Sequence, residues 1–521
     1  MDSLSLRLVL LLALLNAALY CCLLPLWEGF DEPFHYAYVE SLSANRQIPV
    51  LKQTTISQEI RTSLDIVPVS FILKRNIPGT IAFEDWFALP HAEQARRINE
   101  LRAIPSIQRK TPSSLLNYEA QQTPLAYLIL APFDALFSGI ELPTRVLILR
   151  LFLSFAATIL TFWGCNRLCH ELGLSGPFRI LLLATFFETQ IFAAAVYHVA
   201  NDWLSITAAV WFFALTASLV NRSRTRDTLL LSSVVAVGLF SKAYFLAFVP
   251  VFLGVLAYQK RRSRLPVKTI VFSTLVPLVL TGPWYGRNLL LYKTLAGMQE
   301  NVGAQGRPNV LYAFRHIYWG KALLESARWS LWTGNESHLA FSQNTLNLQL
   351  LLLLGALVLF AVHARKIQAA ELWTLLTAFV FILALLYDLC VTWIDTHGLQ
   401  TTTGPYYSPC ILPAVLALSF LGLQRSGAVG CILAIITCIL AAWVAALTYL
   451  AKLVPYYGGF IGRSTIGSLW NWWTAPSGHT TLALTALAPA GMVYFLLACF
   501  LIILALLVAR TVSKLKKVAA Q

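Results

Sequence analysis

The chain has 521 residues, of which 57% are hydrophobic and 12% are charged, and its formal net charge is +15. A soluble protein carries about twice that share of charged residues, so the composition excludes an ordinary soluble fold. Uncharged apolar runs of about 20 residues recur along the chain, which predicts an all-α polytopic membrane protein. Much of the basic charge lies between these runs, where it reports topology, and we expect no nucleic-acid partner.

We predict about twelve transmembrane helices. Their approximate bounds are 6–26, 145–165, 180–197, 203–220, 228–241, 243–258, 268–284, 346–363, 372–393, 408–424, 428–450 and 489–509. The chain then divides into the first helix at 1–27, a long loop at 28–144, helices two to seven at 145–284, a second loop at 285–345, and the last five helices at 346–521 with a further loop at 452–488.

Clusters of basic residues predict the orientation. Under this count they all fall on one side: Arg222, Arg224 and Arg226; Lys260, Arg261, Arg262 and Arg264; Arg365 and Lys366; Arg425; and Lys514, Lys516 and Lys517. Basic loops are retained in the cytoplasm. We therefore expect cytoplasmic termini and three larger segments on the outer side.

The first loop opens with an acidic motif, Asp31-Glu32-Pro33-Phe34-His35, just after the first apolar helix. Ionisable groups beside a bilayer are costly unless they are used or paired. A carboxylate here could act as a general base on an acceptor hydroxyl or amine, and His35 lies one helical turn after Asp31. The alternative is structural, because an aspartate cap, a proline and an acid are also typical of a helix start.

Two helices that lie on the membrane surface are predicted in the same loop. Residues 90–104 place apolar side chains on one face and arginines elsewhere, which suits a surface helix. Residues 124–137 are apolar but short for a span, so we place them at the interface. Glu119, Gln122 and Tyr127 surround the start of this segment, either as site residues or as part of a capped helix start.

Two outer turns carry further candidates. His198, Asn201 and Asp202 lie between the third and fourth spans, where Asp202 is either a second acid or a helix cap. Lys242 lies on the turn of the short helix pair at 228–258. Its ammonium group could bind a phosphate as a point charge, or it could extend to lipid headgroups.

Arg287 and Tyr406 complete the set. Arg287 follows the seventh span, where it is either a bidentate phosphate ligand or an interface anchor. Tyr406 precedes the tenth span, in a turn whose tyrosines are also typical of a membrane interface. Acids, lysine, arginine and histidine thus converge on one membrane face, as a site for a lipid-linked substrate requires.

The order of these features resembles the GT-C superfamily of membrane glycosyltransferases. That superfamily includes protein O-mannosyltransferases, lipid A aminoarabinose transferases and oligosaccharyltransferases. In these proteins the first outer loop opens with an acidic motif, matched here by Asp31-Glu32. A proline-containing motif then leads into an interfacial helix, matched by residues 122–127.

A bacterial branch of uncharacterised GT-C proteins is more similar, because it carries an Asp-Glu-Pro-x-His motif like that of residues 31–35. Its Asn-Asp, Ser-Lys and Arg-Asn landmarks match Asn201-Asp202, Ser241-Lys242 and Arg287-Asn288. At residues 404–406 the chain has Gly-Pro-Tyr where Gly-Arg-Tyr is usual. That departure removes a phosphate contact expected from this position.

The resemblance implies an inverting transfer of sugar from a polyprenyl-phosphate donor to an acceptor, on the outer face of a bacterial inner membrane. Asp31 would be the base and Glu32 its alternate, and Lys242 and Arg287 would hold the donor phosphate. The remaining candidates would line the acceptor or substrate side: His35, Glu119, Gln122, Tyr127, His198, Asn201, Asp202 and Tyr406. No cofactor is assigned. Some relatives use a divalent metal, but Asp202 has no second acid close in sequence.

Two other functions stay open. A transporter or flippase of a lipid-linked substrate would also place polar groups near the membrane, but usually within spans and broken helices. A non-catalytic membrane scaffold is the third possibility. The sugar is not specified by the sequence, and the acceptor could be protein, lipid or polysaccharide. Asn335-Glu336-Ser337 also forms a glycosylation sequon on the expected outer side.

Overall fold

The computed structural model describes residues 3–262, 265–298, 309–363, 367–462 and 464–520. Within these ranges nine helical stretches are long and apolar enough to cross a membrane, so the predicted all-α polytopic fold is confirmed. They are α1 (Ser3–Leu23), α8 (Leu142–Glu171), α11 (Asp202–Arg222), η3 with α13 (Ala243–Arg261), α14 (Val267–Tyr292), α18 (Gln343–Val362), α19 (Ala369–Asp395), α21 through α22 (Gly427–Tyr457) and α25 (Ala490–Ala519).

Every one of the twelve predicted spans contains a helix, but three differ from a simple crossing. The third is a pair, α9 (Gly176–Glu188) and α10 (Gln190–Val196), bent by 55°. The fifth and tenth are α12 (Thr225–Leu239) and α20 (Leu412–Arg425), of 15 and 14 residues. At 1.5 Å per residue these helices cover about 21–23 Å, less than the roughly 30 Å of hydrocarbon.

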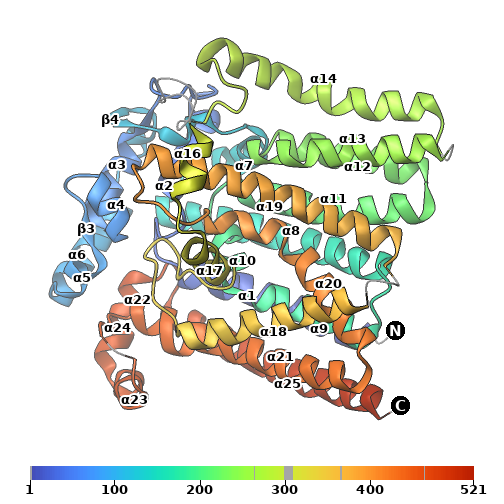
Figure 1. The fold of residues 1–521 in the computed structure, drawn as a ribbon. Coiled ribbons are helices and arrows are strands. Elements are labelled where there is room, and N and C mark those ends of the chain that lie inside the picture. The colour runs from blue at the N-terminus through green and yellow to red at the C-terminus, as the bar shows by residue number, and fades with distance from the viewer. Residues whose placement is uncertain (1–2, 263–264, 299–308, 364–366, 463, 521) are drawn as a thin grey trace.

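Both termini lie at one end of the helical bundle, and the first loop lies at the other end (Figure 1). Arg510 and Lys514 near the end of α25 donate to the hydroxyl of Ser5 at the start of α1. The basic clusters at the ends of α11, α13, α20 and α25 agree with this arrangement. Arg264, Arg365 and Lys366 lie outside the described residues. Which end faces the cytoplasm stays a prediction.

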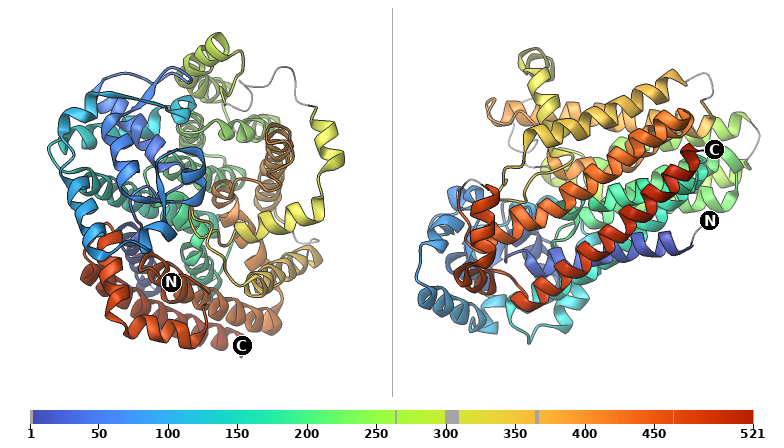
Figure 2. Two further views of the ribbon diagram at one scale, coloured as in Figure 1. Left: turned by 90° about the vertical axis from the view of Figure 1, so that its left-hand side faces the viewer. Right: turned by 90° about the horizontal axis from the view of Figure 1, so that it is seen from below.

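The first loop is a compact unit rather than a loose connection (Figure 2). Its elements are α2 (Glu32–Ala44), β1 (Thr55–Ser57), α3 (Gln58–Ile66), β2 (Pro68–Val69), α4 (Phe71–Asn76), β3 (Ile81–Ala82), α5 (Phe83–Phe87), α6 (His91–Arg102), η1 (Ser106–Lys110), β4 (Pro112–Leu116), η2 (Tyr118–Gln121) and α7 (Leu125–Leu136). Strands β1 and β4 pair antiparallel, and β2 and β3 pair in parallel. The helices predicted at 90–104 and 124–137 are α6 and α7; their place at the membrane surface stays a prediction.

A buried ionic network fixes this loop to the bundle. Arg145 of α8 pairs with Glu59 of α3 at 2.5 Å and lies 3.5 Å from Asp134 of α7. Arg109 of η1 also binds Asp134 and lies 3.5 Å from Glu40 of α2. Buried charges are tolerated only when they are paired and hydrogen-bonded. The loop is therefore held in one position against α8.

The later outer segments are also largely helical. They contain α16 (Val310–His316), α17 (Trp319–Trp329), the 3-10 helix η5 (Pro405–Cys410), the π-helical turn η6 (Thr448–Leu453), α23 (Ile466–Thr474) and α24 (Pro476–Thr485). The glycosylation sequon lies between α17 and α18. The Asn335 side chain is buried; it donates to the Tyr457 hydroxyl at 2.6 Å and accepts from Gln190 at 3.0 Å. The folded protein thus does not present this sequon for modification.

Candidate active site

Asp31 is placed by an unusual stretch of backbone between α1 and α2. Trp27 and Asp31 both adopt left-handed conformations, with φ of 67° and 53°, which residues other than glycine rarely do. Gly29 lies against the His198 ring, where a side chain would not fit. Asp31 precedes α2, yet its side chain makes no capping hydrogen bond. The carboxylate instead accepts a hydrogen bond from the Tyr118 hydroxyl.

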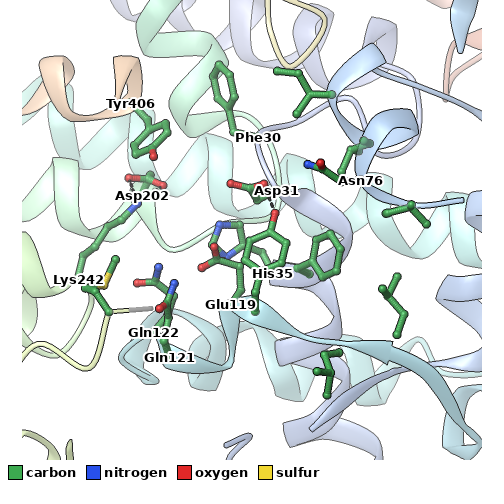
Figure 3. A pocket seen from close by; sticks show the side chains of 18 of the residues that line it. Phe30, Asp31, His35, Asn76, Glu119, Gln121, Gln122, Asp202, Lys242 and Tyr406 are labelled. Atoms are coloured by element: carbon green, nitrogen blue, oxygen red, sulfur yellow. Dashed lines mark hydrogen bonds and ion pairs between the residues drawn. The ribbon is translucent and has the colours of Figure 1, made fainter. Parts of the chain in front are cut away.

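The Asp31 carboxylate lines a cavity of about 530 Å³. The polar side chains of its wall are Asp31, His35, Asn76, Tyr118, Glu119, Gln121, Gln122, Asp202, Lys242, Gln400, Tyr406 and Tyr407. Figure 3 shows the Lys242–Asp202 pair and Tyr406 on one side and Asn76 on the other, with Asp31, His35 and Glu119 between them. The volume of this cavity is within the range of small-molecule sites.

The surroundings of Asp31 favour its protonated form more than water does. Burial raises the pKa of its carboxyl group above the ordinary value, and the negative charge of Asp202 adds to this shift. The hydrogen bond from Tyr118 and the charge of Lys242 act in the opposite direction. A base with a raised pKa holds an abstracted proton more strongly, and enzymes tune general bases in this way.

Lys242 and Asp202 form a buried ion pair at the cavity wall. The Lys242 ammonium donates to both Asp202 oxygens, at 2.6 and 2.7 Å. The same nitrogen lies 4.9 Å from the centre of the Tyr406 ring and 5.6 Å from that of Tyr407. An ammonium group has three N–H donors, and Asp202 engages two of them. The ammonium group also lines the cavity.

His35, Glu119 and Gln122 form the floor between these groups. His35 Nδ1 is 2.7 Å from the Tyr127 hydroxyl and 3.8 Å from a Glu119 oxygen. Burial and the charge of Lys242 hold the pKa of His35 well below its ordinary value, so its imidazole is neutral at pH 7. Asn201 stands behind the wall, donating to Gln122 at 3.0 Å and to the Ser241 carbonyl at 2.9 Å.

Glu32 does not line the cavity, which departs from the expectation that it is an alternate base. Its oxygens accept from the Arg150 guanidinium, with one Nε distance of 2.7 Å, and from the Val199 backbone N–H at 2.9 Å. Burial alone would raise the pKa of Glu32, but Arg150 lowers it below the ordinary value. Glu32 is therefore a buried structural anion that holds the start of α2 against α8.

Arg287 and His198 also lie away from the cavity wall. Helix α14 continues to Tyr292, so Arg287 is inside the helix, where its guanidinium stacks 4.6 Å from the Trp284 ring and donates to the Pro49 carbonyl at 3.2 Å. His198 contacts the Phe30 carbonyl through Nε2 at 3.2 Å. The structure thus brings Asp31, His35, Glu119, Gln122, Asp202, Lys242 and Tyr406 to one cavity, with Tyr127 and Asn201 behind them.

Two acids near the site were not predicted. Glu28 is fully buried, accepts from the Ser337 backbone N–H at 3.0 Å, and has a pKa raised by burial to about 8. Glu336, its neighbour across this contact, has a pKa raised well above the ordinary value by burial and by the charges of Asp31 and Glu28. Glu28 lies three residues before the acidic motif of the first loop, but only the fold could place residue 336 beside it.

Within the described part of the chain, no group of three or more histidine, cysteine, aspartate or glutamate side chains is arranged to hold a metal ion.

Comparison with known proteins gives no family assignment. No family profile and no curated protein sequence matches the chain. Two solved structures of ArnT from Cupriavidus metallidurans are similar at 13% sequence identity and a TM-score of 0.39. The alignment with the apo structure covers 87% of this chain and 75% of the ArnT chain. The alignment with the structure bound to undecaprenyl phosphate covers 88% of this chain and 76% of the ArnT chain.

Proposed function

We propose that this chain is a membrane-embedded glycosyltransferase that transfers a sugar, with inversion, from a polyprenyl-phosphate donor to an acceptor. One observation carries the proposal. The buried carboxylate of Asp31 is not used as a helix cap, and it lines a polar cavity at the end of the bundle opposite the termini. The acceptor is a hydroxyl or an amine, and the reaction takes place on the outer membrane face.

The proposed reaction needs one base. Asp31 takes the proton of the acceptor group while the acceptor oxygen or nitrogen attacks the anomeric carbon of the sugar. The bond between that carbon and the phosphate oxygen breaks, and its electron pair leaves with the polyprenyl phosphate. Positive charge develops at the sugar ring in the transition state, as in other glycosyl reactions. The anionic carboxylates around the cavity would stabilise that charge.

Lys242 is the residue that would stabilise the departing phosphate. Among the described residues, Lys242 is the only lysine or arginine that lines the cavity. Asp202 holds its ammonium group in place through two hydrogen bonds. A donor phosphate near Tyr406 would receive the third N–H. Arg287, in contrast, does not line the cavity, so we do not assign it to the phosphate.

An apolar groove supports a lipid-linked donor. Its volume is about 850 Å³, and leucine, isoleucine and valine side chains of α17, α18 and α20 form most of its wall. Ser408 lines this groove, while Tyr406 and Tyr407 of the same 3-10 helix, η5, line the polar cavity. A polyprenyl chain in the groove would bring its phosphate to η5 and hence to Lys242.

A transporter or flippase is the second candidate, and one observation favours it. The bent pair α9–α10 carries a buried carboxylate, Glu188, at its break, and broken helices with intramembrane acids are typical of transporters. The cavity residues point to an enzyme instead, because they lie at helix ends and in outer turns. A scaffold would need no aligned base, so the same experiment tests it.

The experiment is transfer of radiolabelled sugar from polyprenyl-phosphate donors by the purified protein and by its Asp31→Asn variant. We expect the rate to fall by about 100-fold or more, the usual contribution of general base catalysis. Asp65→Asn is the matched control, because Asp65 is in the same loop, half exposed and paired with Arg61 outside the cavity. Equal donor binding by both proteins without turnover on any acceptor extract would support transport or scaffolding instead.

A further inference from the structure

A second polar site lies inside the bundle, away from the cavity. Between α9 and α10 the chain bends by 55°, and Glu188 at this break lines a small pocket of about 30 Å³. Glu188 is 7% exposed, and no hydrogen bond or ion pair to it is present among the described residues. An ionisable side chain within a span is costly unless it is partnered, so its position indicates a function.

The pocket around Glu188 is lined by several side-chain oxygen atoms that can accept or coordinate. The Thr437 hydroxyl donates a hydrogen bond to the Leu433 carbonyl at 2.9 Å, and the Thr189 hydroxyl donates to the Thr185 carbonyl at 2.6 Å. Both hydroxyls therefore keep only lone pairs for the pocket. The side-chain oxygens of Thr185 and Gln349 also line it, and both are buried without a hydrogen-bond partner in the described chain.

When Glu188 is ionised, the charge balance of this pocket calls for one positive charge. One carboxylate is present, and no lysine, arginine or histidine lines the pocket in the described ranges. A monovalent cation would neutralise the carboxylate, whereas a divalent ion would leave an excess charge in a medium of low dielectric constant. The volume equals that of about one water molecule, which suits a small ion.

We propose that this Glu188 pocket binds one sodium ion, held by the carboxylate of Glu188 and by the side-chain oxygens of Thr185, Thr189, Gln349 and Thr437. These residues come from α9, the break after it, α18 and α21. Sodium would thus join three helices at the point where α9 ends. The proposal does not depend on the transferase function, since no residue of the polar cavity takes part.

The test is binding of radioactive sodium to the full-length protein in detergent, together with its melting temperature as sodium replaces choline at constant ionic strength. We expect saturable binding and a rise in Tm of about 2 °C, because a ligand that binds only the folded state stabilises it. Glu188→Gln keeps the shape of the side chain, should fold, and should lose both responses.

A pair of threonine variants serves as the matched control. Thr437 and Thr374 are both in spans, and both hydroxyls donate to the carbonyl four residues before them, but only Thr437 lines the pocket. Thr437→Val should weaken sodium binding about tenfold or more, and Thr374→Val should leave it unchanged. Absence of sodium binding by the wild-type protein, or equal binding by Glu188→Gln, would overturn the proposal.

Discussion

The backbone conformation of Asp31 determines the direction in which its carboxylate points. A left-handed conformation at a residue with a side chain costs about 1–2 kcal/mol, and it persists only where the surroundings enforce it. Here Glu32 is fixed to Arg150 on one side of Asp31, and Gly29 packs against His198 on the other. This backbone turns the carboxylate away from the α2 N–H groups that a cap would bind and toward Tyr118.

Removing the Tyr118 hydroxyl should change the pH dependence of transfer. The base must be deprotonated, so activity rises as the pH passes the pKa of Asp31. The hydrogen bond from Tyr118 lowers that pKa, so Tyr118→Phe should raise it further. We expect the acidic limb of kcat/KM to move to higher pH, with a loss of up to about tenfold at acidic pH and little change at alkaline pH.

Tyr38→Phe is the control for this measurement. The Tyr38 ring stacks on Tyr127 at 4.1 Å, but its buried hydroxyl has no hydrogen-bond partner in the described structure and does not line the cavity. Its pH profile should equal that of the wild type. A Tyr118→Phe profile that is lowered evenly at every pH, with no shift of the limb, would contradict the assignment of Asp31 as the base.

Seven of the twelve polar cavity residues could be predicted from the sequence, because polar residues at the outer ends of apolar helices lie on one face of the membrane. Asp31, Asp202 and Lys242 are such cases. The partners could not be predicted. Glu32 pairs with Arg150 in the first third of α8, 118 residues along the chain. Arg287 turned away from the cavity because α14 extends to Tyr292, beyond the predicted end of the span.

At the scale of elements, the break between α9 and α10 shows what periodicity alone misses. The sequence 180–197 was predicted as one continuous span, and no proline or glycine marks the bend. The break is held by distant partners: Asn16 of α1 donates to the Phe187 carbonyl at 3.0 Å, and Gln190 accepts from the Thr333 N–H at 2.9 Å. Such long-range hydrogen bonds replace the helical ones that the bend removes.

The apolar groove gives a prediction for α18. Leu354 lies on its wall and is 58% exposed. A tryptophan at this position would fill part of the groove, so Leu354→Trp should raise the apparent KM for a long-chain polyprenyl donor by about tenfold. A donor with one short prenyl unit should be used as well as by the wild type. The measurement is initial rate against donor concentration for both chain lengths.

Leu375→Trp is the matched control on α19. Leu375 is 43% exposed on a spanning helix but does not line the groove. Its kinetics with both donors should be unchanged. If Leu354→Trp impaired the short-chain donor as strongly as the long-chain donor, the variant would be acting on the polar cavity or on folding, and the groove would not be the site of the lipid chain.

For the whole molecule, the sequence was sufficient for the class and the order of helices, since apolar length and basic clusters are local signals. The packing of the first loop was not accessible in this way. Glu59, Arg109 and Asp134 of the loop are buried together with Arg145 of α8, and no local pattern in the sequence indicates this pairing. That network makes the loop one wall of the cavity instead of a mobile cover.

The orientation of the whole molecule can be tested through α7. At 12 residues, α7 is too short to cross the bilayer as a straight helix. With α12 counted as a crossing, as the sequence predicts, the five crossings α8, α9–α10, α11, α12 and α13 separate Ile107 from Arg262, so these two exposed residues should lie on opposite sides of the membrane. A membrane-impermeant maleimide should label Ile107→Cys in intact cells and Arg262→Cys only after permeabilisation.

The wild-type protein gives the background, and this should be low because eight of its nine cysteines are buried. Labelling of both variants in intact cells would mean that α7 crosses the membrane, and labelling of Arg262→Cys alone would invert the predicted topology.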